Sequence, residues 1–340
     1  MEVSEKANTA AIKEIAHSYI IVCVSSPGSD GGELKNQDRV LTRVIEDDGC
    51  QQRSLAIVCD GLTQSPNSAE AAQHVSENVH RLYQEYGVQQ LAGELLQKRE
   101  QLIKTPLRLD HIESQVLKSM FADIVMEKRE SSYQTTFIST CVQRDDANTG
   151  KLEVKVLGCG DSSLFVFISD GTLLFNTLGL ADRDDKFEHL SPITKALPDN
   201  NDSIISHSLQ FSDDVHLLLC SDGFYDSFEK FSDMVCWLME NRERLSQDAG
   251  KEEAVAELHT ALCRKKGDDD ISLIWLAPVD DRAGIEVGKN VSDADQAATP
   301  PERRLSRVTY AKNYLLEKLL SVLRWFRIIR GEESGGRAYD

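Results

Sequence analysis

The sequence predicts an α+β fold in which antiparallel strands form the scaffold and helices are inserted between groups of strands. Three observations lead to this fold class. Short apolar segments separated by turn residues occupy 17–59 and 135–220, helical patterns fill 68–125 and 229–265, and aspartates follow or precede several strands. Strands and helices therefore do not alternate as they do in a doubly wound parallel sheet.

Ten segments have the length and apolar content of strands. They are 17–24, 40–45, 55–59, 135–143, 152–158, 164–169, 173–175, 204–209, 215–220 and 271–277. Turn signals at 47–49, 148–150 and 170–171 separate neighbours, so the chain is expected to open as a β-meander.

Five segments show apolar residues at helical spacing of three and four. They are 72–86, 91–103, 112–125, 229–245 and 252–265. Asn67 or Ser68 is suited to cap the first of them.

The composition indicates an acidic protein with a sizeable core. Of the 340 residues, 41% are hydrophobic and 28% are charged, and the net charge is −18. A surface of that sign repels nucleic acid, which excludes nonspecific phosphate-backbone binding for the whole chain. The eight cysteines form no C-x-x-C pair, the first residues lack a secretory apolar segment, and no apolar run predicts a membrane span. These features predict reduced thiols and a cytoplasmic protein.

The composition changes after Pro278, which predicts four regions. They are a globular domain over 1–278, a flexible linker over 279–305, a basic amphipathic helix over 306–330 and a disordered tail over 331–340. The helix has leucines on one face and five basic residues between 312 and 330 on the rest. Three roles stay open for it: packing on the globular domain, docking a partner protein, or lying on a membrane surface.

Carboxylates stand at the ends of three predicted strands that are far apart in the chain. Asp60 follows the strand 55–59, Asp222 follows 215–220, and Asp269 precedes 271–277. A single Asp-Gly after a strand is more often a turn than a ligand. Three such ends, with Asp38 near the start, suggest one acidic site gathered by a β-scaffold. Two divalent cations sharing carboxylate ligands would make such a site hydrolytic, and phosphate esters suit that chemistry.

An ordered series of short motifs gives this site a family resemblance. The motifs are N-Q-D-R at 36–39, V-C-D-G at 58–61, Q-T-T at 134–136, G-C-G-D-S-S at 158–163, S-D-G at 169–171, S-D-G-F-Y-D at 221–226 and D-D-I-S at 269–272. Each motif alone is weak, but their order and spacing resemble those of the metal-dependent (PPM) protein phosphatases of type 2C, in the style of bacterial members. The resemblance covers about residues 17–278.

The resemblance implies a four-layer α-β-β-α sandwich of two packed antiparallel sheets flanked by helices. It also implies two Mn²⁺ or Mg²⁺ ions, with a third in some members. The residues that would form the site are Asp60 as the bridging ligand, the Gly61 carbonyl, Asp222 and Asp269, Asp38 through water, Gln37 behind the ligands, and Asp161 near the third ion. Residues 176–200 match the family's flap, which lies near the site.

Several residues depart from the family pattern. Gln37 replaces a more common Glu, and Ser163 stands where Arg is usual. Leu62 to Pro66 replaces the glycines after the bridging Asp, and Asp270 stands where Asn is usual. No Arg precedes Asn36, so Lys35 is the candidate phosphate-binding residue, as a point charge and not a bidentate fork.

The resemblance implies a protein serine/threonine phosphatase that hydrolyses phosphoserine and phosphothreonine through a metal-bridging hydroxide. Its partners would be phosphorylated proteins and a cognate Ser/Thr kinase. The alternative is a catalytically weak or inactive phosphatase-like module that binds and regulates a phosphoprotein partner. The C-terminal helix would add a protein or membrane-surface contact, leaving the protein cytoplasmic or peripheral to the membrane.

Overall fold

The computed structural model describes ten stretches and one isolated residue of the chain. They are 19–27, 36–46, 52–109, 112, 114–144, 151–181, 186–187, 195–200, 203–211, 215–265 and 269–278. The contacts divide the chain into a unit over Met1–Val287 and a unit over Gly288–Asp340. The predicted linker, basic helix and tail lie outside the described residues, as does Lys35.

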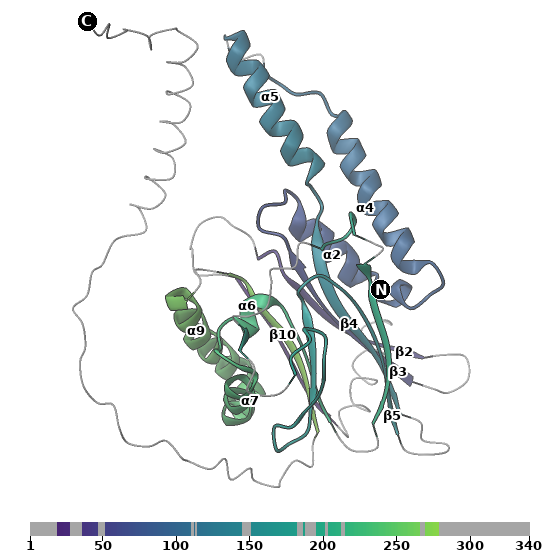
Figure 1. Ribbon diagram of the computed structural model, residues 1–340, viewed down its shortest axis with the longest axis vertical. Coiled ribbons are helices and arrows are strands. Elements are labelled where there is room, and N and C mark those ends of the chain that lie inside the picture. Colours follow the sequence, from purple (N-terminus) through teal and green to yellow (C-terminus); the bar gives the residue numbers. More distant parts are fainter. Residues whose placement is uncertain are drawn as a thin grey trace, which may run out of the picture. The chain divides into compact units, whose positions relative to one another are not determined.

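Two five-stranded antiparallel sheets form the scaffold (Figure 1). The first has the strand order β1-β10-β9-β6-β7, and the second has the order β2-β3-β4-β5-β8. The strands are β1 Tyr19–Ser26, β2 Arg39–Glu46, β3 Gln52–Gly61, β4 Thr135–Arg144, β5 Leu152–Cys159, β6 Ser163–Phe167, β7 Leu173–Asn176, β8 Ile205–Phe211, β9 His216–Cys220 and β10 Ile271–Pro278. All ten predicted strands are present, and the sandwich prediction is confirmed.

The central strands are apolar along their whole length because both of their faces are covered. In β3, Ala56 and Val58 belong to the core between the sheets, whereas Leu55, Ile57 and Cys59 face the helices outside. The two-residue period of a strand produces this division. The same alternation divides β6, β9 and β10 between the middle core and a core on the other outer face.

Helices cover the outer face of each sheet, which makes four layers (Figure 1). The helices α2 Ser68–Glu77, α3 Val79–Leu82 and α4 Gly87–Lys104 pack on the sheet that contains β3. The helices α7 Phe231–Glu240, α8 Arg242–Leu245 and α9 Asp248–Lys265 pack on the sheet that contains β10. In the described part of the chain, no helix is long and apolar enough to cross a membrane.

The helices differ from the sequence prediction in two ways. Two predicted helices are each broken, α2 from α3 at Asn78 and α7 from α8 at Asn241. At each break the asparagine amide donates to a carbonyl of the preceding turn, from Asn78 to His74 and from Asn241 to Trp237. This side-chain bond competes with helix continuation. The short helix α6, Asp222–Tyr225, was not predicted.

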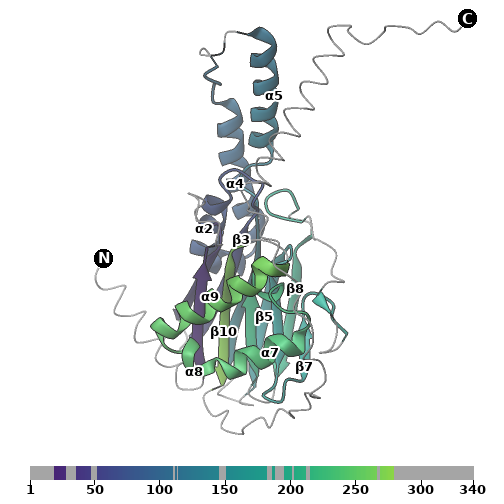
Figure 2. The ribbon, with the colours of Figure 1, turned by 90° about the vertical axis from the view of Figure 1, so that its left-hand side faces the viewer.

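The helices α4 and α5, Gln115–Glu130, form a hairpin that projects beyond the strands in both views (Figures 1 and 2). The near half of α4 is fixed to the sheet through the fully buried Leu91, Ala92 and Leu95. In contrast, α5 has no buried residue. The hairpin is therefore anchored at its base and open to solvent along its length.

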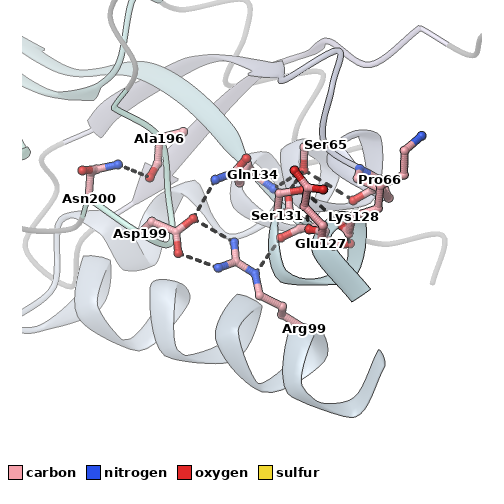
Figure 3. A network of polar contacts seen from close by, with 11 residues as sticks. Ser65, Pro66, Arg99, Glu127, Lys128, Ser131, Gln134, Ala196, Asp199 and Asn200 are labelled. Carbon is pink, nitrogen blue, oxygen red and sulfur yellow. Dashed lines mark hydrogen bonds and ion pairs between the residues drawn. The ribbon is translucent and has the colours of Figure 1, made fainter. Parts of the chain in front are cut away.

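A partly buried ion pair holds the outer half of α4 to the sandwich (Figure 3). The Arg99 guanidinium donates to both carboxylate oxygens of Asp199, at 2.5 and 3.0 Å, and to the Ser132 carbonyl at 2.8 Å. The Gln134 amide donates to the same carboxylate at 2.7 Å. These bonds lower the pKa of Asp199 against the opposing effect of its burial. The network joins α4, the start of β4 and the segment 195–200.

We predict that Arg99→Met lowers the free energy of unfolding by about 1–3 kcal/mol, because Asp199 and the Ser132 carbonyl lose a buried charged donor. Lys104→Met is the matched control on the same helix. Its pair with Glu100 is 74% and 66% exposed, so its loss should change stability by less than about 0.5 kcal/mol. Urea unfolding of both variants measures the difference. Equal losses would contradict the role of Arg99.

Candidate functional site

The strand order brings five aspartate-bearing ends to one end of the sandwich. In the second sheet Arg39 pairs with Cys59, so Asp38 at the start of β2 lies beside Asp60 at the end of β3. In the first sheet Leu273 pairs with Cys220, so the start of β10 lies beside the end of β9. Asp222 follows β9 and Asp269 precedes β10. Asp161 lies in the connection from β5 to β6, which links the second sheet to the first.

Asp60 lies at the electrostatic centre of this group. Burial raises the pKa of Asp60 well above its usual range, and the negative charges of four neighbouring carboxylates raise it further. In order of effect these neighbours are Asp38, Asp222, Asp269 and Asp161. The four acids therefore surround the one that the sequence analysis placed between two cations.

The neighbours show the same effect. Burial and then the Asp270 charge raise the pKa of Asp38 to about 7. Burial and then Asp222 raise the pKa of Asp269 to about 7, and burial and then Asp161 raise that of Asp222 to about 6. Burial also raises the pKa of Asp161. Without added positive charge, these carboxylates cannot all ionise at neutral pH without a free-energy penalty.

The deepest of these acids also lacks full hydrogen bonding. The Asp38 side chain is 1% exposed, and neither of its oxygens has a partner of normal hydrogen-bond geometry among the described residues. The side chains of Asp60, Ser272 and Ser221 lie close enough to lower its pKa somewhat. One oxygen of Asp161, Oδ1, is buried and unpartnered in the same part of the structure. Unsatisfied buried carboxylates of this kind match the oxygen ligands that Mg²⁺ and Mn²⁺ prefer.

The acidic side chains lie near one another, but as described they do not form a complete metal site. Within the described ranges, no group of three acidic, histidine or cysteine side chains is arranged to hold a metal ion as it stands. The predicted roles of the individual ligands therefore stay predictions. What the structure provides is a donor set of the right chemistry in mutual electrostatic range.

Backbone contacts hold three of the acids in place. The Thr135 hydroxyl donates to the Asp60 carbonyl at 2.8 Å. The amide of Gly223 donates to the Asp222 carboxylate at 2.8 Å, and the amide of Asp270 donates to the Asp269 carboxylate at 2.9 Å. The Asp222 and Asp269 carboxylates thus each have one oxygen engaged with their own turn, which limits the directions in which the other oxygen can point. At Asp60 it is the backbone that is fixed.

Gly61 and Gln37 lie next to one another at the end of β3. A Cβ on Gly61 would come within 3.0 Å of the Gln37 carbonyl oxygen, the Gln37 Cβ and the Ser68 backbone. The strand end can therefore approach the 36–38 segment closely only because residue 61 is glycine. The structure places Gln37 beside the acids through its backbone, whose amide donates to an Asp270 carboxylate oxygen at 2.7 Å.

Four residues at the site were given no role by the sequence analysis. Ser221 and Ser272 bond to each other across β9 and β10, from the Ser272 amide to the Ser221 hydroxyl at 3.1 Å, and both lie against Asp38. Asp270 anchors the Gln37 amide, and Asp226 raises the pKa of Asp161, Asp222 and Asp269. All four lie within the quoted motifs, at 221–226 and 269–272. A search of each motif for further carboxylates would have found Asp226 and Asp270, whereas the contact of the two serines with Asp38 depends on the strand register.

The segment 195–200, at the end of the predicted flap, contacts residues next to two of the acids. Leu197 exchanges backbone hydrogen bonds with Thr135, at 2.9 and 3.0 Å. A Cβ on Gly160, whose φ is 97°, would lie 2.7 Å from the Lys195 carbonyl. The segment therefore packs between the residue that supports Asp60 and the glycine that precedes Asp161. Most of the rest of 182–194 lies outside the described residues.

We predict that Gly223→Ala disrupts the site, because its Cβ would lie 2.1 Å from the Asp270 carbonyl oxygen and would force the Asp222 and Asp269 turns apart. Addition of Mn²⁺ should then not give the rise in thermal midpoint that we expect for the unchanged chain. The control is Gly93→Ala in α4, where a new Cβ meets nothing within 4 Å. It should keep the metal-induced shift and gain up to about 1 kcal/mol of stability. A normal shift in Gly223→Ala would contradict the proposed contact.

Comparison with known proteins agrees with this arrangement. Residues 31–263 match the family model "Protein phosphatase 2C". No curated protein matches the chain. One similar solved structure is the serine/threonine phosphatase Stp1 from Staphylococcus aureus, which is 17% identical in sequence. The match covers 76% of this chain and 94% of that chain, with a TM-score of 0.41. PppA, a regulatory component of the T6SS in Pseudomonas aeruginosa, has 18% identity, 76% and 97% coverage and a TM-score of 0.41.

A third similar structure is the PPM Ser-Thr phosphatase MsPP from Mycobacterium smegmatis in complex with cacodylate, with 17% identity, 76% and 97% coverage and a TM-score of 0.40. The family model spans more than two thirds of the chain and includes Asp38, Asp60, Asp161 and Asp222. The chain belongs to the protein phosphatase 2C family.

Proposed function

We propose that this chain is a metal-dependent phosphatase that hydrolyses phosphoserine and phosphothreonine in proteins. The observation that carries the proposal is the group of five aspartates around Asp60, in which the buried Asp38 carboxylate has no full hydrogen-bond partner among the described residues. On a protein phosphatase 2C scaffold, such a group is best satisfied by two divalent cations. Either Mn²⁺ or Mg²⁺ suits an all-oxygen donor set.

The residues that would hold the ions are those at the shared end of the sheets. They are Asp60 between the two ions, the Gly61 carbonyl, Asp222 and Asp269, with Asp38 acting through water and Asp161 toward a third ion. When bound, the cations supply positive charge to the phosphoryl oxygens and make the attacking water more acidic.

The chain's own residues would position the reactants. Asp270 holds the Gln37 amide at 2.7 Å, and the Asn36 side chain accepts from the Asp38 amide at 2.9 Å, so the 36–38 segment has a fixed geometry against β10. Ser221 and Ser272 lie against the Asp38 carboxylate and favour its ionised form. A carboxylate fixed in this way could orient a buried water molecule beside the ions.

The second candidate is a phosphatase-like module that binds a phosphoprotein and regulates it without efficient hydrolysis. Two observations favour it: no three described side chains are converged on one point, and the sequence has no Arg before Asn36 and has Ser163 where Arg is usual. Binding would then use the same acidic end and its cations, with Lys35 as the nearest predicted phosphate contact.

Phosphorylated proteins are the proposed partners, and a Ser/Thr kinase would supply them. The linker over 279–305 and the basic helix over 306–330 would connect this domain to a partner protein or to a membrane surface. A cytoplasmic location follows from the proposed substrates and from the sequence composition.

The deciding experiment is hydrolysis of p-nitrophenyl phosphate and of a phosphothreonine peptide, with Mn²⁺ and with EDTA. We expect turnover that requires the metal, and a fall of at least about 100-fold in kcat for Asp60→Asn, because a ligand matters more than its supporting groups. Asp233→Asn, an exposed carboxylate on α7, is the charge-matched control and should be fully active. A folded protein that binds Mn²⁺ and phosphopeptide but shows no turnover would support the second candidate.

We also predict that the metal-free protein loses stability as the pH rises from about 4 to about 7. The folded pKa values of Asp38, Asp222 and Asp269, about 6 to 7, lie above the unfolded value of about 4. The folded chain therefore holds more protons in this window, so its free energy of unfolding falls with pH. Mn²⁺ should reverse the trend, with a larger thermal shift at pH 8 than at pH 5.5.

Thermal midpoints in EDTA and in Mn²⁺ at both pH values measure this effect. Asp60→Asn removes a carboxyl group whose pKa is raised in the folded chain, so its midpoint in EDTA should depend less on pH than that of the unchanged chain. An unchanged pH dependence in this variant would assign the trend to the overall net charge and not to the site.

A further inference from the structure

The link between α5 and β4 is hydrogen-bonded to the loop that follows Asp60 and Gly61. Four bonds join residues 131–134 to residues 62–66: from the Leu62 amide to the Gln134 carbonyl, from the Tyr133 amide to the Pro66 carbonyl, from the Ser65 hydroxyl to the Ser131 carbonyl and from the Gln134 amide to the Ser65 hydroxyl. Because Ser65 is buried, its two bonds are shielded from competing water. The link therefore fixes the loop next to the central aspartate.

The first of these bonds sets the direction of the Gly61 carbonyl. The Leu62 amide donates to the Gln134 carbonyl at 3.3 Å. This amide and the Gly61 carbonyl belong to one planar peptide group, in which they point in opposite directions. Because the Leu62 N–H points toward β4, the Gly61 carbonyl points toward β2, the neighbour of β3 on the other side. The donor that a continued ladder would offer it there, the Gln37 amide, is bonded to Asp270 at 2.7 Å.

The Gln134 side chain connects this peptide group to the ion pair of α4 (Figure 3). Its amide donates to the Asp199 carboxylate at 2.7 Å, and the Arg99 guanidinium donates to the same carboxylate at 2.5 and 3.0 Å. The guanidinium also donates at 2.8 Å to the carbonyl of Ser132, two residues before Gln134. These bonds and the chain between residues 132 and 134 close a ring, so the backbone of this segment is restrained from both ends.

We infer that Gln134 is a positioning residue for the metal site, because its side chain holds the backbone group that orients the Gly61 carbonyl. The inference rests on the proposed function, in which that carbonyl is a ligand. Gln134 acts through the Leu62 amide and not by contact with an ion or a substrate. Loss of its bond to Asp199 loosens the peptide group after Gly61 and weakens metal binding. Loss of such supporting bonds typically lowers metal affinity by about 10- to 100-fold.

The first test is the Mn²⁺ dissociation constant of the full chain, measured by isothermal titration calorimetry well below the thermal midpoint. Gln134→Glu replaces the amide donor by a carboxylate of the same shape, which Asp199 repels, and should raise the constant by about 10-fold. Gln210→Glu is the matched control. The Gln210 amide also donates to a carboxylate, that of Glu153 at 3.0 Å across β8 and β5. This variant adds the same charge and should leave the constant unchanged.

A charge swap separates the hydrogen bond from a general loss of stability. When Gln134→Glu is combined with Asp199→Asn, the amide introduced at position 199 can donate to the carboxylate introduced at position 134. The side-chain carbonyl at position 199 can still accept from Arg99. The Mn²⁺ dissociation constant of the double variant should therefore return toward that of the unchanged chain. A double variant that binds Mn²⁺ as weakly as Gln134→Glu would contradict the role of this bond.

Hydrogen exchange of the Leu62 amide in EDTA gives a readout that needs neither metal nor turnover. The amide should exchange about 5-fold faster in Gln134→Glu than in the unchanged chain, as expected for the weakening of one hydrogen bond. Gln210→Glu should not alter its exchange. An equal exchange rate in all three proteins would overturn the inference.

The metal titration separates failure of the inference from failure of the proposed function. An unchanged chain that does not bind Mn²⁺ would overturn the proposed function and this inference with it. An unchanged chain that binds Mn²⁺, with the same affinity in Gln134→Glu, would overturn the inference alone.

Discussion

The mutual repulsion of five aspartates at one end of the sandwich is the constraint on which the site depends. Asp38, Asp60, Asp161, Asp222 and Asp269 come from five separate segments of the chain, and the pKa of each is raised in the folded protein. Carboxylates separate if nothing holds them, so the scaffold must resist that tendency. Two sheets of five strands with fully buried central strands provide the necessary rigidity.

Two glycines let the elements that carry the acids approach each other closely enough to form a site. Gly61 lets the end of β3 approach the backbone of Gln37, and Gly223 lets the start of α6 approach the carbonyl of Asp270. At both positions a Cβ would separate elements that carry an acid. The close approach also lets one acid fix another segment, since the Asp270 carboxylate accepts the Gln37 amide across 233 residues of sequence.

The strands and most of the acids could be predicted from the sequence because both follow from local patterns. A buried strand that ends in Asp-Gly is visible in any sequence, and Asp60 and Asp222 are of this kind. Asp38 has a weaker local pattern, and Asp161 could be assigned to the site only through the order of the motifs. The helix breaks at Asn78 and Asn241 depend on side-chain hydrogen bonds to the preceding turn, which helical periodicity does not contain.

The site residues that were not predicted depend on register and on distance across the fold. Ser221 and Ser272 are ordinary strand-end serines until the pairing of β9 with β10 places both against Asp38. Arg99 appears in the sequence as one more charge on a helix. Its low exposure, 7%, and its two bonds to Asp199 are visible only once α4 is folded against the segment 195–200.

That segment gives the hairpin a physical connection to the acidic site. Asp199 receives Arg99 from α4, Leu197 pairs with Thr135 on β4, and the Thr135 hydroxyl donates to the Asp60 carbonyl. Every step is a hydrogen bond or an ion pair between neighbouring groups, and Arg99 lies in the half of α4 that is nearer the hairpin tip. Leu91 and Leu95 fix only the near half of α4 to the sheet. A change in the angle of α4 would therefore move Arg99 and its partner Asp199 more than it would move the sheet. Arg99 on α4 and the central aspartate are thus the two ends of a short series of contacts, through which a movement of the hairpin could alter the geometry of the site.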